Sequence, residues 1–336
     1  MLSSKQKATG PFALIWGVGA CLILAILAII IEQAIPMAII GSSLIALMMG
    51  LFIKLPKQYD AGLKFTSKRV LKFAIILLGA SLNIGIIVEV GKTSMWVMVF
   101  TLLTCFGGGY FIGKALGLDW KLSNLISAGT GICGGSAIAA IAPVIEADDS
   151  SVAYAMSATF LFDMAMIFLF PIVGRMLQMS DFSFGLWTGT AVNDTSSVIA
   201  TAYAFSENAG EIATMVKLTR TLSIIPVVLI FSFIMTRNKS KQSTTKVSIL
   251  SLFPWFIAGF IAMSLLNTVG IITPELAQIL KTISKFLMVM ALAAIGLSTN
   301  VSEMKKAGIA PMVHGFIISA LVVLVSYLVM MFMNIV

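Results

Sequence analysis

Apolar runs of 18 or more residues recur from one end of this 336-residue chain to the other. Each run is long enough to cross a hydrocarbon core of about 30 Å as a helix. In lipid the backbone must satisfy its own hydrogen bonds, so unbroken runs of this length favour helices over a barrel. With 59% apolar and 11% charged residues, a water-soluble, disordered or disulfide-stapled chain is excluded. We predict one all-α polytopic membrane domain over residues 1–336.

About eleven transmembrane helices are expected. The tenth is short and could begin earlier, near Leu276. The predicted segments are 12–31, 36–53, 70–90, 95–112, 122–145, 153–177, 184–205, 212–235, 249–269, 286–297 and 311–335.

The distribution of charge in the connections predicts the orientation of the chain. With the N-terminus in the cytoplasm, most of the 22 Lys and Arg residues lie in cytoplasmic connections, and the opposite connections contain only Lys92. The C-terminus is then outside the cytoplasm. The formal net charge of +8 is explained by the anionic cytoplasmic leaflet, so no nucleic-acid partner is expected.

Two segments of the chain resemble each other. Residues 63–83 read LKFTSKRVLKFAIILLGASLN and residues 280–300 read LKTISKFLMVMALAAIGLSTN, with Lys, Ser, Gly and Asn matched without a gap. They lie in the third and tenth predicted spans, and this odd offset makes them antiparallel. Inverted repeats are typical of secondary transporters, in which two like halves move around a central site. We therefore expect Asn83, Ser298 and Asn300 to line the site.

A weaker similarity relates the fifth and seventh spans. GTGICGGS, residues 129–136, can be aligned with GTAVNDTS, residues 189–196. The two spans would run parallel as counted, which does not fit an inverted repeat. Either one of them is re-entrant, or the similarity reflects common chemistry.

The stretch GTGICGGS has two interpretations. Small residues within a span allow close helix packing. However, four glycines and two hydroxyls in eight residues also weaken a helix and free backbone groups, which is tolerated only beside a cavity or protein. We expect a discontinuous helix here, whose second half presents its positive end to an anion. The candidate binding residues are Gly131, Cys133, Gly134, Gly135 and Ser136.

The most polar sequence within any span is TAVNDTSS, residues 190–197. An ionised Asp at the bilayer centre costs about 2.5–3.5 kcal/mol, so it should be paired, protonated or hydrated. An interhelical hydrogen bond would account for these residues, but a place in the transport site is favoured. The candidates are Asn193, Asp194, Thr195 and Ser196. Asp163, alone in the sixth span, joins Asp194 as a candidate ion-coupling carboxylate, although a single hydrogen bond would also explain it.

Two basic residues lie in the eighth predicted span. Lys217 is expected to extend its amine to the membrane interface. Arg220 lies deeper, and its planar guanidinium matches oxyanions through two parallel bonds. Arg220 either forms a salt bridge with Asp194 or Asp163, or binds an anionic substrate directly.

Several classes of function lack their motifs. The chain has no phosphate-binding loop of ATPases, no metal-ligand cluster and no motif of an intramembrane protease. We therefore expect neither an enzyme nor a bound cofactor or metal.

At these residues the chain resembles the YeiH-like family of bacterial membrane proteins, which are labelled sulfate exporters. The resemblance covers essentially the whole chain. The stretches that carry it are LLGASLNIG ending at Gly85, SAGTGICGGSAIAAIAPVIEADD at 127–149, FPIVGRML at 170–177 and WTGTAVNDTSSVIATAYAFSENAGEIATMVKLTRTLSIIP at 187–226.

This resemblance implies kinship with cation/proton antiporters and bile-acid symporters, whose fold has inverted repeats and two crossed, unwound helices. It further implies a multi-pass protein of the bacterial plasma membrane. Residues 133–135 lack the proline found in the corresponding turn of the bile-acid carriers.

Together these features predict a secondary active transporter. It would export a small anion such as sulfate, sulfite or a sulfonate, coupled to H⁺ or Na⁺. The alternatives are a cation/proton antiporter without an anionic substrate, and a channel or non-transporting membrane sensor. The expected partners are the anion, the coupling ion and the lipid bilayer, with a second copy of the chain as a candidate.

Overall fold

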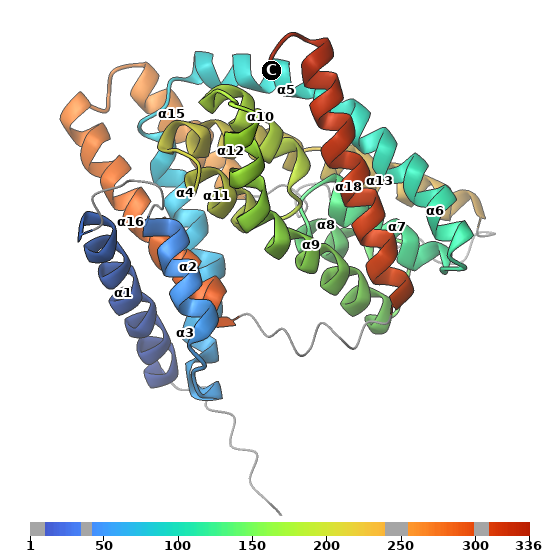
Figure 1. Cartoon of the computed structure of the whole chain (residues 1–336), viewed down its shortest axis with the longest axis horizontal. Coiled ribbons are helices and arrows are strands. Elements are labelled where there is room, and N and C mark those ends of the chain that lie inside the picture. Colours follow the sequence, from blue (N-terminus) through green and yellow to red (C-terminus); the bar gives the residue numbers. More distant parts are fainter. Residues whose placement is uncertain (1–10, 35–41, 239–254, 299–308) are drawn as a thin grey trace, which may run out of the picture. The chain divides into compact units, whose positions relative to one another are not determined.

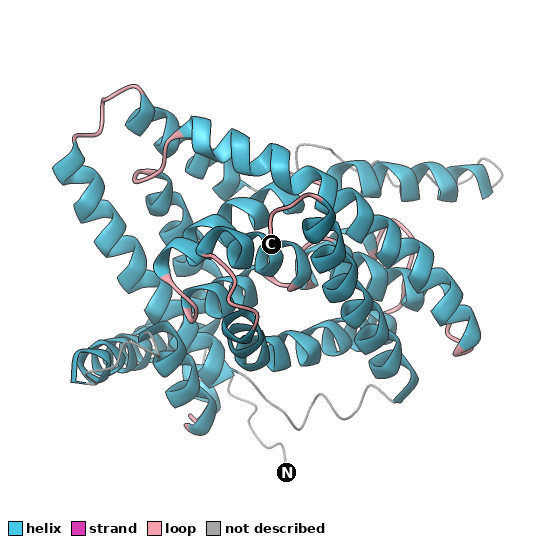
Figure 2. Cartoon of the chain, turned by 45° about the horizontal axis from the view of Figure 1, so that its top comes forward, coloured by secondary structure: helices cyan, strands magenta, loops and turns pink. Residues whose placement is uncertain are grey.

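The computed structural model describes residues 11–34, 42–238, 255–298 and 309–336. Within these residues all regular elements are helices (Figure 2). In the part of the chain that the structure describes, six helical stretches are long and apolar enough to cross a membrane, and Trp255–Thr268 is a shorter apolar helix. The prediction of an all-helical membrane protein is confirmed, whereas eleven crossings remain a prediction. The six are Ala13–Ala34, Ile84–Ala115, Ser150–Met176, Glu207–Met235, Pro274–Ser298 and Ile309–Phe332.

One predicted boundary is wrong. Helix α4 (Leu71–Gly79) ends eleven residues before the predicted end of its span, and α5 (Ile84–Leu103) continues through η3 (Thr104–Gly108) into α6 (Gly109–Ala115). Lys92, assigned to a connection, therefore lies inside α5. The chain turns at residues 80–83, where three successive amides bond to carbonyls three residues back at 3.0–3.1 Å. Flanking apolar residues hide this short turn from a hydropathy pattern.

The tenth predicted segment begins earlier than Phe286, as the alternative start near Leu276 predicted. Helix α16 (Pro274–Ser298) begins near Leu276 rather than at Phe286. Proline is favoured at the first position of a helix, because its missing N–H is not needed there.

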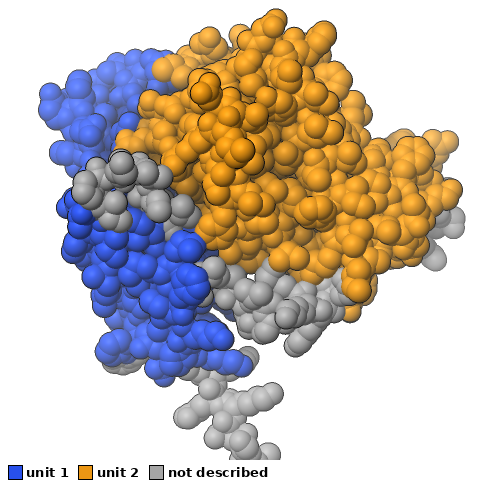
Figure 3. Space-filling model, in the orientation of Figure 1, with its two compact units in different colours: residues 1–84, 256–300 blue, residues 85–255, 301–336 orange. Residues whose placement is uncertain are grey.

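The chain divides into two compact units (Figure 3). Unit 1 comprises residues 1–84 and 256–300, and unit 2 comprises residues 85–255 and 301–336. The single domain expected over the whole chain stays a prediction. Besides α4 and α16, unit 1 contains α1 (Pro11–Ala34), α2 (Ser42–Phe52), η1 (Lys57–Tyr59), α3 (Asp60–Phe65), η2 (Thr66–Val70) and α15 (Trp255–Thr268).

Within unit 1 the two similar segments pack against each other. The Ser284 hydroxyl on α16 donates a 2.6 Å hydrogen bond to the Ala74 carbonyl on α4. Figure 1 shows α16 running opposite to α3 and α4, the antiparallel relation expected from the sequence. The core of this unit is built from α1, α2, α3 and α16, and includes Cys21, Ala46, Leu63 and Ala293.

Helices α1 and α3 of unit 1 lie so close that their backbones are in contact. A β-carbon on Gly17 of α1 would lie 2.7 Å from the Gly62 Cα and 2.9 Å from the Leu63 nitrogen, both on α3. Real β-carbons do not approach other atoms this closely, so α1 and α3 can meet only through glycine at this point.

Replacing Gly17 by Ala is therefore expected to lower the unfolding free energy by about 1–3 kcal/mol, because backbone atoms cannot move aside as side chains can. Gly19→Ala, in the same helix, is the matched control, because no atom lies within 4 Å of its β-carbon. That variant should be unchanged or slightly more stable, since Ala is the better helix former. Melting temperatures in detergent test both, and equal losses would contradict the contact.

Unit 2 contains the remaining helices. They are α5 and α6 with α7 (Trp120–Gly131), α8 (Gly135–Ile141), α9 (Asp149–Met176), α10 (Asp181–Ala191), α11 (Thr195–Tyr203), α12 (Glu207–Thr221), α13 (Ile224–Asn238) and α18 (Ile309–Phe332). Helices α10 and α12 pack closely, because Gly189 faces Val216 and the carbonyl of Ala213.

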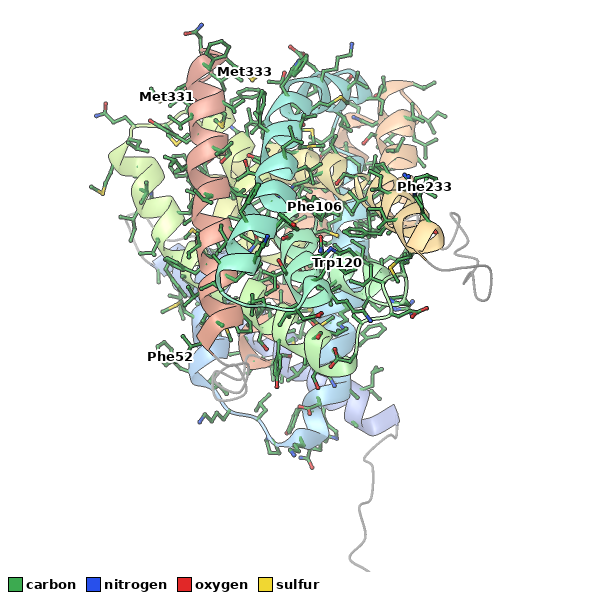
Figure 4. All side chains as sticks on the ribbon, turned by 90° about the vertical axis from the view of Figure 1, so that its right-hand side faces the viewer. Phe52, Phe106, Trp120, Phe233, Met331 and Met333 are labelled. Carbon is green, nitrogen blue, oxygen red and sulfur yellow. The ribbon has the colours of Figure 1, made fainter. Side chains whose placement is uncertain are left out.

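Large apolar side chains also lie on the outside of both units. Phe52 is 77% exposed on unit 1 and Phe233 is 68% exposed on unit 2; both are labelled in Figure 4. In water such exposure would be unfavourable, whereas a lipid environment accommodates it.

Candidate functional site

Helices α7 and α8 form one interrupted helix. After Gly131 the chain leaves the helical conformation at Ile132 (φ −120°, ψ −85°), and Gly134 has φ +62°, a conformation that favours glycine. The Gly134 amide donates to the Gly129 carbonyl at 2.8 Å. The glycine-rich stretch at 129–136 therefore produces the break that the sequence predicts.

Helices α10 and α11 form a second interrupted helix. Val192 and Asp194 are both extended, with ψ near 140° and 146°. The Asp194 carboxylate accepts the Ser196 amide at 2.9 Å and the Ser196 hydroxyl, so Asp194 is the N-cap of α11. Residues 192–194 occupy the positions that align with 132–134 in the weaker sequence similarity. The two similar stretches thus share a break at the same place.

The two breaks are in contact. A β-carbon on Gly134 would lie 3.0 Å from the Asp194 Cβ and 3.2 Å from its Cα. The absence of a side chain at residue 134 leaves the space in which the Asp194 side chain lies.

Gly134→Ala is expected to destabilise the protein by about 1–3 kcal/mol through backbone strain alone, and the clash with Asp194 adds to this cost. Gly135→Ala is the matched control, because its β-carbon would meet only the flexible end of Met156, at 4.0 Å. Thermal unfolding in detergent is the measurement. If both variants melt at the same temperature, residue 134 does not require glycine.

Two buried cations on α12 bind the carboxyl-terminal ends of α7 and α10. The Lys217 ammonium donates to the carbonyls of Ile132 at 2.9 Å, Val192 at 3.1 Å and Asn193. A helix C-terminus carries partial negative charge and unpaired carbonyls, so a cation is favourable there. The expectation that Lys217 reaches the membrane interface is wrong, because its side chain is fully buried.

Arg220 binds the same two helix ends. Its Nε donates to the Gly131 carbonyl at 2.8 Å, and its two terminal nitrogens donate to Thr130 at 2.5 Å and Val192 at 3.2 Å. These bonds go to backbone carbonyls rather than to the carboxylates of Asp163 or Asp194. Neither of the two interpretations from sequence included this arrangement.

A buried carboxylate holds the amino-terminal end of α11. The two Asp163 oxygens accept the amides of Asn193 at 2.9 Å and Asp194 at 2.8 Å. Asp163 lies on α9 and is fully buried. Because the N-terminus of a helix carries partial positive charge, the carboxylate is placed where it is most favourable. The site therefore has cations at the C-termini of two half-helices and carboxylates at the N-terminus of a third.

Most predicted site residues of unit 2 belong to this arrangement. The carbonyls of Gly131 and Asn193 are bound directly by the cations, and the side-chain Nδ2 of Asn193 donates to the Ser319 hydroxyl on α18 at 3.4 Å. Cys133 is buried, Gly135, Thr195 and Ser196 are half-buried, and Ser136 is exposed.

Other predicted residues lie elsewhere. Asn83 follows α4 and Ser298 ends α16, so both belong to unit 1. That they line the transport site remains a prediction. Asn300 lies outside the described residues.

Sequence reasoning missed Lys217 and Ser319 as members of the site. Lys217 carried a usable signal: it is three residues from Arg220, so the two side chains share one face of α12. Ser319 carried none, because a hydroxyl within an apolar span is common.

Comparison with known proteins gives the family of the chain. Residues 16–334 match the family model described as conserved hypothetical protein 698. A UPF0324 membrane protein of Clostridium tetani is 54% identical over 325 residues, covering 92% of this chain and 94% of the relative. The chain belongs to the UPF0324 membrane protein family. A relative in Streptococcus mutans is 40% identical over 324 residues with the same coverage, and one in Fusobacterium nucleatum is 38% identical over 326 residues.

Membership in this family confirms the YeiH-like resemblance. The protein is a bacterial multi-pass membrane protein. The kinship with antiporters and bile-acid symporters and the orientation in the membrane stay predictions.

Proposed function

We propose that this membrane protein is a secondary active transporter whose coupling ion, H⁺ or Na⁺, binds at the Asp163 and Asp194 carboxylates. The observation that carries the proposal is the contact between two helices interrupted at matching positions, with buried charges on their ends. Non-helical backbone within a membrane is tolerated only where protein or a cavity surrounds it. Discontinuous helices of this kind form the ion and substrate sites of secondary transporters.

The proposal includes a topology. The chain crosses the plasma membrane about eleven times, with the N-terminus in the cytoplasm and the C-terminus outside. The antiparallel packing of residues 63–83 against α16 supports an inverted-repeat architecture, because inverted repeats run in opposite directions through the membrane.

The first candidate substrate is a small anion such as sulfate, sulfite or a sulfonate, which the transporter would export. The family resemblance supports this substrate class. Ser136, Thr195 and Ser196 supply hydroxyl donors beside the two breaks, and none of the three is fully buried. Binding of the coupling ion at Asp194 would offset a negative charge in this region and so permit an anion to approach.

The second candidate is a cation/proton antiporter without an anionic substrate. The specific observation in its favour is that all three nitrogens of Arg220 already donate to carbonyls. The amides of Asn193, Asp194 and Ser196, around the start of α11, are likewise bound by Asp163 and Asp194. In this function Arg220 only stabilises the fold, and the two carboxylates alone form the ion site.

Flux into proteoliposomes distinguishes these functions. The protein is reconstituted with an imposed pH or sodium gradient, and uptake of sulfate, sulfite and a sulfonate is measured together with internal pH. Saturable anion uptake that follows the gradient supports the first candidate, whereas exchange of H⁺ for Na⁺ or K⁺ without anion uptake supports the second. Unsaturable flux that ignores the gradient, or no flux, would favour a channel or a sensor and overturn the proposal.

A further inference from the structure

Unit 1 presents a concentration of basic side chains near one end of its α3–α4 helical run. Residues 52–73 contain six basic residues, and Asp60 is the one acidic residue among them. Lys64, Lys68 and Arg69 are all exposed on this run. We refer to these three residues as the basic bulge, for the reason given next.

The basic bulge results from a single widened helical turn. Along the run a buried residue, or a pair of adjacent buried residues, recurs every three or four residues, except between Thr66 and Leu71, which are five apart with no buried residue between them. The intervening turn is the π-helix η2, in which the Leu71 amide donates to the Thr66 carbonyl five residues back. The Thr66 hydroxyl donates to the Gly62 carbonyl at 2.9 Å and closes the preceding turn.

The extra residue of the π turn changes which side chains face outward. Because the buried residues on both sides keep their contacts, the four residues from Ser67 to Val70 are all exposed or half-buried. Two consecutive basic residues are thereby presented outward, one turn beyond Lys64. An ordinary helical turn would rotate one of the intervening residues toward the buried face. Such π-bulges occur frequently at functional sites.

An exposed apolar side chain lies within the basic bulge. Phe65, between Lys64 and Thr66, is 38% exposed. The predicted topology places this region at the cytoplasmic leaflet, whose anionic lipids attract basic residues. Exposed aromatic rings suit the acyl-chain side of that interface, and basic residues suit its phosphate side.

We propose that the basic bulge binds the phosphate headgroup of an anionic phospholipid of the surrounding bilayer. Lys64, Lys68 and Arg69 contact the phosphodiester, and Phe65 lies against the lipid tail. This lipid site is independent of the transport site in unit 2 and of what that site carries.

The test compares phosphatidylglycerol with phosphatidylcholine added to the full chain in detergent. The melting temperature is followed as lipid is titrated. Phosphatidylglycerol is expected to raise the melting temperature more than phosphatidylcholine. The variant Lys68→Gln/Arg69→Gln should require about 30-fold more phosphatidylglycerol for half of the effect, because each basic residue that contacts the bound headgroup phosphate contributes roughly a fivefold factor. Both side chains are exposed, so this variant should melt like the unaltered protein without lipid.

The matched control is Lys114→Gln/Arg237→Gln, which removes the same charge from exposed positions at the ends of α6 and α13. It should respond to phosphatidylglycerol like the unaltered protein. An equal response to the two lipids, or an equal loss in the control variant, would overturn the proposal. Stabilisation by water-soluble glycerol phosphate equal to that by phosphatidylglycerol would also overturn it, because the ligand would then be a free phosphate rather than a lipid.

Discussion

Replacing Arg220 by Met is expected to lower the unfolding free energy by about 3 kcal/mol or more. Met has a similar length but no donor, so the carbonyls of Thr130 and Gly131 at the end of α7 lose their Arg220 bonds. Each buried acceptor left without a partner costs about 1–3 kcal/mol. Chemical unfolding in detergent measures the loss. Arg237→Met, at an exposed position, is the control and should change little.

The Val192 carbonyl provides a second test, because it accepts hydrogen bonds from both buried cations. It accepts from Arg220 at 3.2 Å and from Lys217 at 3.1 Å, so either single variant leaves it one partner. In the double variant Lys217→Met/Arg220→Met both partners are lost. The double variant should therefore lose more stability than the sum of the single variants. Strict additivity, or an Arg220→Met variant as stable as the unaltered protein, would show that the cations do not hold the two helix ends.

Asp163→Asn is expected to destabilise the protein, whereas Asp194→Asn is expected to abolish coupled transport without destabilising it. Asp163 uses both carboxylate oxygens to accept amides of residues 193 and 194. An Asn side chain offers one oxygen and turns an N–H toward the second amide, so we expect a loss of about 2 kcal/mol or more. At Asp194 the change is mild for the fold, because Asn is as good an N-cap as Asp.

Transport measurements test the role of Asp194 in coupling. Asp194 is half-buried whereas Asp163 is fully buried, and Asp194→Asn removes a titratable group while keeping its cap. Gradient-driven flux should therefore be lost in the well-folded Asp194→Asn variant. Melting temperature and proteoliposome flux are measured on the same preparations. An Asp194→Asn variant with unaltered coupling would remove Asp194 from the proposed ion site, and an Asp163→Asn variant of normal stability would remove Asp163 from the cap of α11.

Part of the candidate site could be predicted from the types of residue at particular positions. Glycines within GTGICGGS weaken a helix wherever they occur, so the break between α7 and α8 was predicted from the sequence, and the structure confirms it. Residues 190–197 were recognised as polar, but the break between α10 and α11 was not predicted from them. The turn at residues 80–83 was not visible. It depends on Thr268, distant in the sequence, whose hydroxyl accepts the Ile84 amide at 2.9 Å.

The partners of the charged residues were also beyond sequence reasoning. Arg220 and Lys217 were assigned to an anion, a carboxylate or the membrane interface, because these are the usual partners of isolated cations. Their actual partners are backbone carbonyls at the ends of α7 and α10 that lie 24 to 90 residues away in the sequence, and such contacts have no local pattern.

The sequence by itself determined the class of the protein and the interruption at residues 129–136. Both follow from local physics, since hydrocarbon requires long apolar helices and glycine weakens a helix wherever it occurs. Only the tertiary structure decided that the two interruptions meet, and that α12 and α9 supply the charges for their ends. A half-helix end needs an opposite charge, but which distant residue supplies it depends on how the helices pack.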